Sequence, residues 1–279
     1  MALTPQYDRS DFSLEDCPHE NTEPLSPDDF EILKQIGSGG FGSVHKAIYK
    51  RDRSSWAIKK LERFTEGTSN ILMIMNEIAL LDAVDHPNII QLFGFYLTDE
   101  DIHLVLELAP KGDLGHMLFR GNFSESKAKH FVLQIAEALE YLHENQIIHR
   151  DVKTLNVLLM NDDQIKLTDF GTATVVDSSG STRGDVGTPY SRAPEIILKQ
   201  SYSKNVDWWS LGVLLYELVT GQQPFHEGMS QIFHFSSLLN LLDLLSHLTD
   251  LTFCVCFDRL RSRQFRAQYL NFRSFFLFR

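Results

Sequence analysis

The sequence HRDVKTLNVLLMNDDQIKLTDFG at positions 149–171 holds the most informative pattern in the chain. Two polar motifs, HRDVKTLN and DFG, flank apolar runs that predict short strands around Val157–Leu159 and Ile165–Leu167. Before them, KHFVLQIAEALEYLHENQ (129–146) repeats apolar residues at i, i+3 and i+4, which predicts an amphipathic helix. After them, VDWWSLGVLLYELVTG (206–221) is apolar almost all round and predicts a buried helix. This part of the chain is therefore expected to be mainly helical.

The region upstream is expected to be rich in strands. Between the third and fourth of its strand-like segments, Ile71, Met75, Ile78 and Leu81 recur at helical spacing and predict one helix. A small β-rich lobe and a larger helical lobe would leave a cleft between them, where ligands usually bind. The five predicted strands are FEILKQIG (30–37), SVHKAIY (43–49), WAIKKL (56–61), IIQLFGFY (89–96) and HLVLEL (103–108).

A glycine cluster joins the first two predicted strands. Gly37, Gly39 and Gly42 form the pattern G-x-G-x-x-G, and Val44 follows two residues later. Glycine lets a backbone approach phosphate groups closely. A dinucleotide-binding fingerprint would continue into a helix, whereas strands flank this cluster, which favours a hairpin over the phosphates of ATP. The cluster by itself is also compatible with a plain β-hairpin turn.

A lysine and a glutamate form the next signal. Lys59 lies among apolar residues of the third predicted strand, and Glu77 lies on the predicted helix. As a pair they would hold the lysine ammonium against the α- and β-phosphates of ATP. By themselves they are also compatible with two solvated surface charges.

Together these motifs resemble those of the eukaryotic protein kinase family. The patterns H-R-D-x-K-x-x-N and D-F-G are intact and in the family's order, and the glycine loop, Lys59 and Glu77 precede them. The resemblance covers roughly residues 30–225. It implies an α+β, bilobal kinase fold, with a small five-stranded β lobe carrying one helix and a larger, mainly helical lobe. It also implies transfer of the γ-phosphate of ATP to hydroxyl groups of protein substrates.

The resemblance implies a role for each motif residue. Asp151 would accept the proton of the substrate hydroxyl or orient that hydroxyl, and Lys153 would steady the γ-phosphate. Asn156 and Asp169 would hold Mg2+, which prefers oxygen ligands. The implied catalytic set is Asp151, Lys153, Lys59 and Glu77. The implied ATP-binding set is Ile36, Gly37, Ser38, Gly39, Gly40, Phe41, Gly42, Val44, Ala57, Lys59, Leu106, Glu107, Ala109, Asp113 and Leu158.

Substrate class and regulation are also read from the resemblance. Lys153, in the motif HRDVKTLN, is similar to the residue of the serine/threonine group. Thr188 also fits this group, because it would bond Asp151 and Lys153. In the family, the arginine at Arg150 usually binds a phosphate on the activation loop. Ser181 and Thr182 are the candidates for that phosphate, which an upstream activating kinase would add. The alternative is a flexible, solvated loop whose hydroxyl groups have no regulatory role.

Two departures concern the substrate side of the motifs. In GTPYSRAPE, the tyrosine of the family pattern stands one place early, at Tyr190, and Ser191 and Arg192 follow it. Leu155 stands where kinases that prefer arginine-rich substrates often carry glutamate. The second departure weakens the case for an arginine-directed substrate preference.

Composition limits the remaining possibilities. The net charge of −11 argues against nucleic acid as the main partner, because phosphate binding needs a basic face. Three cysteines without regular spacing predict free thiols rather than a disulfide framework. Neither a signal peptide nor a transmembrane segment is expected from the sequence. The expected location is cytoplasmic, with the nucleus as an alternative.

The ends of the chain differ from the middle. Residues 1–29 are acidic and carry four prolines, which predicts a disordered segment. The kinase domain is expected over residues 30–228, with one lobe at about 30–107 and the other from about 110. Residues 229–279 form a tail rich in Leu, Phe and Ser that lacks glycine, proline and lysine. The tail is either an alternative or mis-spliced C-terminus, a divergent helical end, or a membrane-surface segment.

Two functions from different classes follow. The first is an active protein serine/threonine kinase that uses Mg-ATP. The second is a catalytically impaired, kinase-like splice product that acts as an ATP-binding decoy or scaffold. The intact motif residues favour the first function, whereas the unusual tail keeps the second open.

Overall fold

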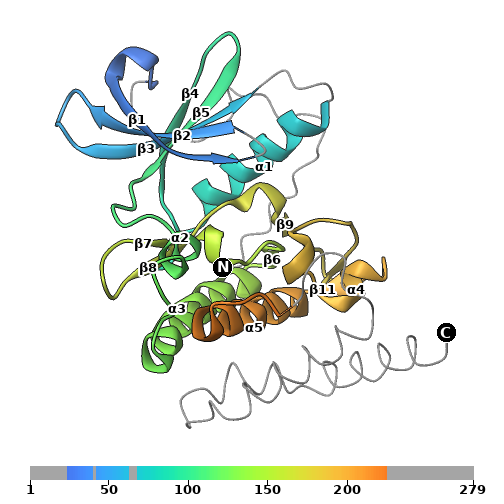
Figure 1. Cartoon of the computed structure of the whole chain (residues 1–279). Coiled ribbons are helices and arrows are strands. Elements are labelled where there is room, and N and C mark those ends of the chain that lie inside the picture. The colour runs from blue at the N-terminus through green and yellow to red at the C-terminus, as the bar shows by residue number, and fades with distance from the viewer. Residues whose placement is uncertain (1–23, 40–41, 63–67, 225–279) are drawn as a thin grey trace, which may run out of the picture. The chain divides into compact units, whose positions relative to one another are not determined.

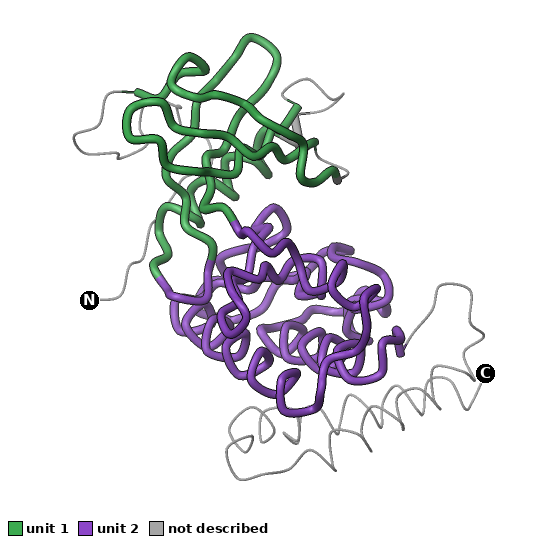
Figure 2. Tube along the Cα trace, turned by 60° about the vertical axis from the view of Figure 1, so that its left-hand side comes forward, with its two compact units in different colours: residues 1–85, 90–108 green, residues 86–89, 109–279 purple. Residues whose placement is uncertain are grey.

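The computed structural model describes residues 24–39, 42–62 and 68–224. They fall into two compact units, which Figure 2 shows in two colours. The first unit comprises the described residues of 1–85 and 90–108. The second comprises residues 86–89 and the described residues from 109 onward. The predicted tail at 229–279 therefore lies outside the described residues.

The first unit is an antiparallel sheet with one helix (Figure 1). Its five strands are arranged in the order β1-β2-β3-β5-β4, and α1 (Thr68–Ala83) lies between β3 and β4 in the sequence. The strands are β1 (Phe30–Gly39), β2 (Gly42–Tyr49), β3 (Ser55–Glu62), β4 (Leu92–Leu97) and β5 (Asp101–Glu107). All five strands and the helix are therefore present within a few residues of the predicted bounds.

Aromatic side chains build a core on this sheet. The ring of Phe30 lies 5.2 Å from that of Tyr49 and 5.7 Å from that of Tyr96, and all three are buried. Ile58 and Val105, which are paired across β3 and β5, belong to the same cluster. Burial of aromatic rings contributes much of the stability of such a small unit.

The segment just before β1 differs from the expectation of disorder. Pro27–Asp29 form a short 3₁₀ helix, and Ser26 caps it by exchanging hydrogen bonds with Asp29. Leu25 packs against the aromatic cluster and reaches Gly94, where a Cβ atom would clash with it. One half-buried leucine and a capped turn thus order residues 24–29, although the average composition of residues 1–29 is polar. Residues 1–23 lie outside the described part.

The second unit is mainly helical. In Figure 1, α3 (Glu125–Glu144) and α5 (Asn205–Thr220) lie side by side and form its centre. Ser124 caps α3 by accepting from the amide of Lys127, and Gly221 ends α5 with a left-handed φ of 70°. The predicted strands are present as β7 (Val157–Leu159) and β8 (Ile165–Leu167). The two units together confirm the α+β, bilobal fold class.

Several short elements were not predicted. They are too short for a period to be read from the sequence. Within the described ranges, no helix is long and apolar enough to cross a membrane. The additional elements are α2 (Leu114–Leu118), β6 (Ile147–Ile148), η3 (Thr154–Asn156), η4 (Phe170–Thr172), β9 (Thr174–Val175), β10 (Ser181–Thr182), η5 (Pro189–Ser191), α4 (Pro194–Ile197) and β11 (Tyr202–Ser203).

Candidate active site

The first unit places the predicted Lys–Glu pair on one face of its sheet. Nζ of Lys59 on β3 donates a hydrogen bond to Oε1 of Glu77 on α1 at 2.7 Å. The side chain of Glu77 is 4% exposed and that of Lys59 is 15% exposed. They form a largely buried ion pair and are not two separate surface charges. Such a pair fixes the ammonium in place, where it can attract an anion.

Strand register adds apolar residues to the same face. Val44 is paired with Lys59, and Ala57 is paired with Leu106. Cross-strand partners point to the same face, and Ala57 and Lys59 are two residues apart on β3, so all four side chains share one face. This face brings together Val44, Ala57, Lys59 and Leu106 of the predicted ATP-binding set, whereas Glu107, the next residue on β5, is paired with Trp56 and lies on the opposite face.

The β1–β2 hairpin needs glycine for steric reasons. Gly42 has a φ of +145°, and a Cβ atom there would collide with the carbonyl oxygen of Lys60. The backbone of β2 can thus approach β3 only without a side chain at this position. Of the predicted hairpin residues, Ile36, Gly37, Ser38 and Gly39 lie in β1, Gly42 and Val44 lie in β2, and Gly40 and Phe41 lie outside the described residues.

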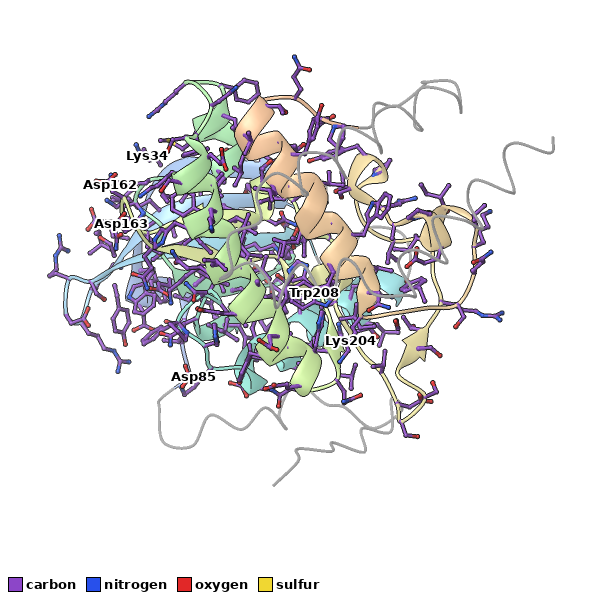
Figure 3. The ribbon with its side chains drawn as sticks, turned by 90° about the horizontal axis from the view of Figure 1, so that it is seen from below. Lys34, Asp85, Asp162, Asp163, Lys204 and Trp208 are labelled. Atoms are coloured by element: carbon purple, nitrogen blue, oxygen red, sulfur yellow. The ribbon has the colours of Figure 1, made fainter. Side chains whose placement is uncertain are left out.

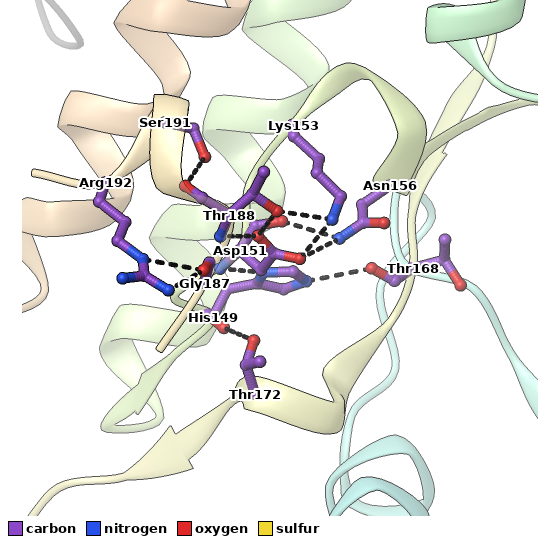
Figure 4. Close-up of polar contacts among 10 residues, drawn as sticks. All are labelled: His149, Asp151, Lys153, Asn156, Thr168, Thr172, Gly187, Thr188, Ser191 and Arg192. Atoms are coloured by element: carbon purple, nitrogen blue, oxygen red, sulfur yellow. Dashed lines mark hydrogen bonds and ion pairs between the residues drawn. The ribbon is translucent and has the colours of Figure 1, made fainter. Parts of the chain in front are cut away.

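The second unit gathers a polar cluster around Asp151 (Figure 4). Oδ2 of Asp151 accepts from Nζ of Lys153 at 2.7 Å and from Nδ2 of Asn156 at 3.0 Å. Its Oδ1 accepts from both the backbone amide and the hydroxyl of Thr188, at 2.8 Å and 2.6 Å. Nζ of Lys153 also donates to the Thr188 hydroxyl at 2.7 Å. Four residues that the sequence singled out are therefore in direct contact.

A buried aspartate on α5 holds the backbone just before this cluster. Oδ2 of Asp207 accepts from the amide of His149 at 2.9 Å, and Oδ1 accepts from the amide of Arg150 at 2.7 Å. Arg150 has a left-handed φ of 69°, a conformation that costs a non-glycine residue about 1–3 kcal/mol. The two bonds to Asp207 offset this strain and hold the backbone of His149 and Arg150 in place.

Asn156 and Asp169 offer oxygen atoms to a metal ion. Nδ2 of Asn156 donates to Asp151, which fixes the orientation of the amide so that its Oδ1 can act as a ligand. The carbonyl of Asn156 accepts from the amide of Thr168, the residue before Asp169, so the two candidate ligands lie on adjacent segments. Within the described residues, no group of three or more His, Cys, Asp or Glu side chains gathers as a metal site. Two oxygen donors fit Mg2+, which usually takes its other ligands from water and substrate phosphates.

Asp113 and Leu158 of the ATP-binding set also come together. A β-bridge joins their backbones, and Leu158 lies in β7. Asp113 caps α2 by accepting from the amide of His116 at 2.8 Å. Ala109, in the same unit, accepts a hydrogen bond from the amide of Gly112.

The predicted regulatory residues occupy a short strand. Ser181 and Thr182 form β10, which pairs with β11, and Thr182 is opposite Tyr202. The guanidinium of Arg150 donates to the carbonyl of Thr172 at 2.6 Å and to the hydroxyl of Tyr202 at 3.3 Å. Tyr202 therefore links the two residues: its hydroxyl contacts Arg150, and its backbone is paired with that of Thr182.

Sequence reasoning missed one polar group close to the cluster. Glu217 on α5 is buried, and its Oε2 accepts from the hydroxyl of Thr154 at 3.2 Å. Burial raises the pKa of Glu217 to about 7, although hydrogen bonds from Thr154 and Gln223 lower it. The sequence did offer a signal for this group, namely a glutamate within an otherwise apolar helix. A glutamate that is buried in such a helix usually has a partner.

Comparison with known proteins agrees with this geometry. A family model for the protein kinase domain matches residues 30–253. An Aurora kinase from Candida glabrata is 38% identical over 223 residues, which are 79% of this chain and 62% of that protein. Serine/threonine-protein kinase ATG1c from Arabidopsis thaliana is 40% identical over 208 residues, 73% of this chain and 28% of that protein. Calcium-dependent protein kinase 5 from Plasmodium falciparum is 38% identical over 231 residues, 81% of this chain and 40% of that protein.

The extent of these matches decides what they establish. The chain spans about three fifths or less of the length of these curated relatives. The family model, by contrast, matches most of the chain and contains both polar motifs, the glycine cluster and the Lys59–Glu77 pair. The chain therefore belongs to the protein kinase family.

Proposed function

We propose that this chain is an ATP-dependent protein serine/threonine kinase. The observation that carries the proposal is the Asp151 carboxylate, whose two oxygens are oriented by Lys153, Asn156 and Thr188. The Arabidopsis relative is a serine/threonine-protein kinase, which supports the same substrate class. Neither the described site nor the comparisons favour the alternative of a decoy.

The cluster suits transfer of a phosphoryl group to a hydroxyl. Asp151 would exchange one of its present donors for the substrate hydroxyl and accept its proton as the hydroxyl oxygen bonds to the γ-phosphorus. The bond from the γ-phosphorus to the oxygen that bridges it to the β-phosphate would break in the same step, with ADP as the leaving group. Lys153, 2.7 Å from Asp151, would balance the charge on the transferred group. Lys59, fixed by Glu77, would bind the phosphates that are not transferred.

The proposed ATP and metal ligands follow the sequence-based sets given above. Asn156 and Asp169 would hold magnesium through their oxygen atoms. Magnesium bound to ATP supplies charge neutralisation on the phosphates. We also propose the domain limits 30–228 and a cytoplasmic or nuclear location, both on grounds of sequence.

The proposal is tested by transfer of the γ-phosphate from Mg-ATP to a mixed protein substrate, followed by identification of the modified residues. We expect phosphoserine and phosphothreonine, loss of transfer when EDTA removes magnesium, and loss of transfer in Asp169→Asn. Equal transfer by the intact chain and Asp169→Asn would reject the proposed chemistry. Phosphotyrosine alone would reject the substrate class.

We further propose that phosphorylation of Ser181 or Thr182 by an upstream kinase raises activity. Thr182 is paired with Tyr202, whose hydroxyl already contacts Arg150, so a phosphate on β10 would lie near a fixed cation. The variant Ser181→Ala/Thr182→Ala is expected to lose about tenfold in kcat relative to phosphorylated protein. Full activity of the double variant after incubation with a cell extract and ATP would contradict this role.

A further inference from the structure

One face of α5 contacts three parts of the proposed site. Asp207, Ser210 and Glu217 are three and seven residues apart, so they lie on the same side of the helix. Asp207 holds the amides of His149 and Arg150, and the Ser210 hydroxyl donates to the carbonyl of Ser191 at 2.9 Å. Glu217 is the third polar contact of this face, and its function is not explained by the proposed chemistry.

Glu217 contacts the loop on the far side of Asp151. Its partner Thr154 directly follows Lys153 and begins η3, which ends at Asn156. Both members of the pair are about 4% exposed, and their side chains are 3.2 Å apart. Since Lys153 and Asn156 both donate to Asp151, a fixed Thr154 restrains the segment that carries two of its hydrogen-bond partners.

Among the residues that the structure describes, no cation forms an ion pair with Glu217. Its carboxylate is hydrogen bonded by the uncharged side chains of Thr154 and Gln223. The titratable group that faces it is Tyr190 of η5, whose pKa is raised by burial and by the negative charges of Glu217 and Asp151. A side-chain hydrogen bond from Thr154, which lowers the pKa of Tyr190, means that Thr154 contacts both Glu217 and Tyr190. Burying a carboxyl without a cation costs free energy, and groups of this kind are concentrated at functional sites.

We propose that Glu217 and Thr154 are positioning residues, whose hydrogen bond holds the Lys153–Asn156 segment in the geometry required for phosphoryl transfer. This inference rests on the proposed kinase activity. Asp207 fixes the chain before Asp151, and the Thr154–Glu217 bond fixes it after Asp151. The ionised form of Glu217 accepts the Thr154 hydroxyl bond more strongly than the protonated form does. Activity is thus coupled to the proton on Glu217.

Kinetics of matched variants test the inference. We expect Thr154→Val and Glu217→Gln each to lower kcat by about tenfold at pH 8, because the first removes the hydrogen bond to a charged acceptor and the second replaces that acceptor with a neutral amide oxygen. KM for ATP stays unchanged, and Thr154→Ser, which keeps the hydroxyl, retains most of kcat. The double variant loses no more than Thr154→Val alone, because Glu217→Gln acts through a contact that Thr154→Val already removes.

The pH profile separates positioning from a merely structural effect. The ratio of wild-type kcat to that of Glu217→Gln is expected to rise from near one at pH 6 to about ten at pH 8. Effects of pH on other groups that both proteins share cancel in this ratio. A ratio that does not change with pH, or additive losses in the double variant, would overturn the inference.

Amide hydrogen exchange gives a second readout that does not need activity. In ATP-free protein, Thr154→Val and Glu217→Gln should both speed exchange in the segment 149–157 relative to wild type at the same pH, whereas Thr154→Ser should not. If the wild type transfers no phosphate but this pattern is seen, the proposed function fails and the positioning contact stands. If the wild type is an active kinase and neither exchange nor kcat responds, the positioning role is wrong while the kinase function remains.

Discussion

Replacing Asp151 by asparagine is expected to lower kcat by about a hundredfold to ten-thousandfold, the range typical for loss of a positioned proton acceptor. The two side chains have nearly the same shape, so the fold is retained. The amide, however, cannot accept a proton from the substrate hydroxyl, and its NH2 group would face the donors Lys153 and Asn156 at Oδ2 or Thr188 at Oδ1. The loss should appear in kcat rather than in KM for ATP.

A matched control distinguishes this effect from a general loss of charge. Asp162→Asn makes the same chemical change on the turn between β7 and β8, where Figure 3 labels Asp162 beside Asp163. The side chain of Asp162 is 83% exposed and forms a surface ion pair with Lys111, which contributes little to stability. Wild-type kcat in Asp162→Asn and a reduced kcat in Asp151→Asn, with equal thermal midpoints, are expected. Activity within threefold of wild type in Asp151→Asn would exclude Asp151 as the proton acceptor.

The parts of the site that could be predicted are those carried by residues close in sequence. Asp151, Lys153 and Asn156 lie within one short motif, so their contact follows from local geometry once the motif is recognised. The Lys59–Glu77 pair spans 18 residues, but each partner lies on an element with a clear period, and the strand and helix could both be placed. Periodicity and motif order were sufficient for these contacts.

The parts that could not be predicted depend on long-range packing. Thr154 and Glu217 are 63 positions apart, and no local pattern relates a loop hydroxyl to a residue in an apolar helix. The pairing of Thr182 with Tyr202 is similar, because β10 and β11 have two residues each and show no alternation. Leu25 was assigned to a disordered segment because its neighbours are polar, yet its own burial against the aromatic cluster orders that turn. In each case tertiary contact overrides local composition.

Replacing Asp207 by asparagine is expected to destabilise the protein by about 3–5 kcal/mol, the usual cost of removing one partner from a buried, hydrogen-bonded charge. Asp207 is fully buried and accepts from the amides of His149 and Arg150, and Nε2 of His143 lies 2.8 Å from its Oδ2. Asparagine has one acceptor oxygen, so its NH2 group would oppose one of these donors. The left-handed backbone of Arg150 would lose part of its support, and kcat should fall together with stability.

The pH dependence of this loss gives a sign that can be checked. Burial opposes ionisation of Asp207, but the hydrogen bonds from His143 and the Arg150 amide outweigh it and hold the pKa of Asp207 below its ordinary value of 3.8. The stability that depends on this depressed pKa is present above pH 3.8 and is lost as the pH falls through the lower value in the folded protein. The difference in unfolding free energy between wild type and Asp207→Asn, measured by urea denaturation, should therefore be largest near pH 7 and shrink below pH 4. A difference below about 1 kcal/mol at pH 7, no larger than that of Asp162→Asn, would show that the two backbone bonds to Asp207 do not hold the HRD segment in place.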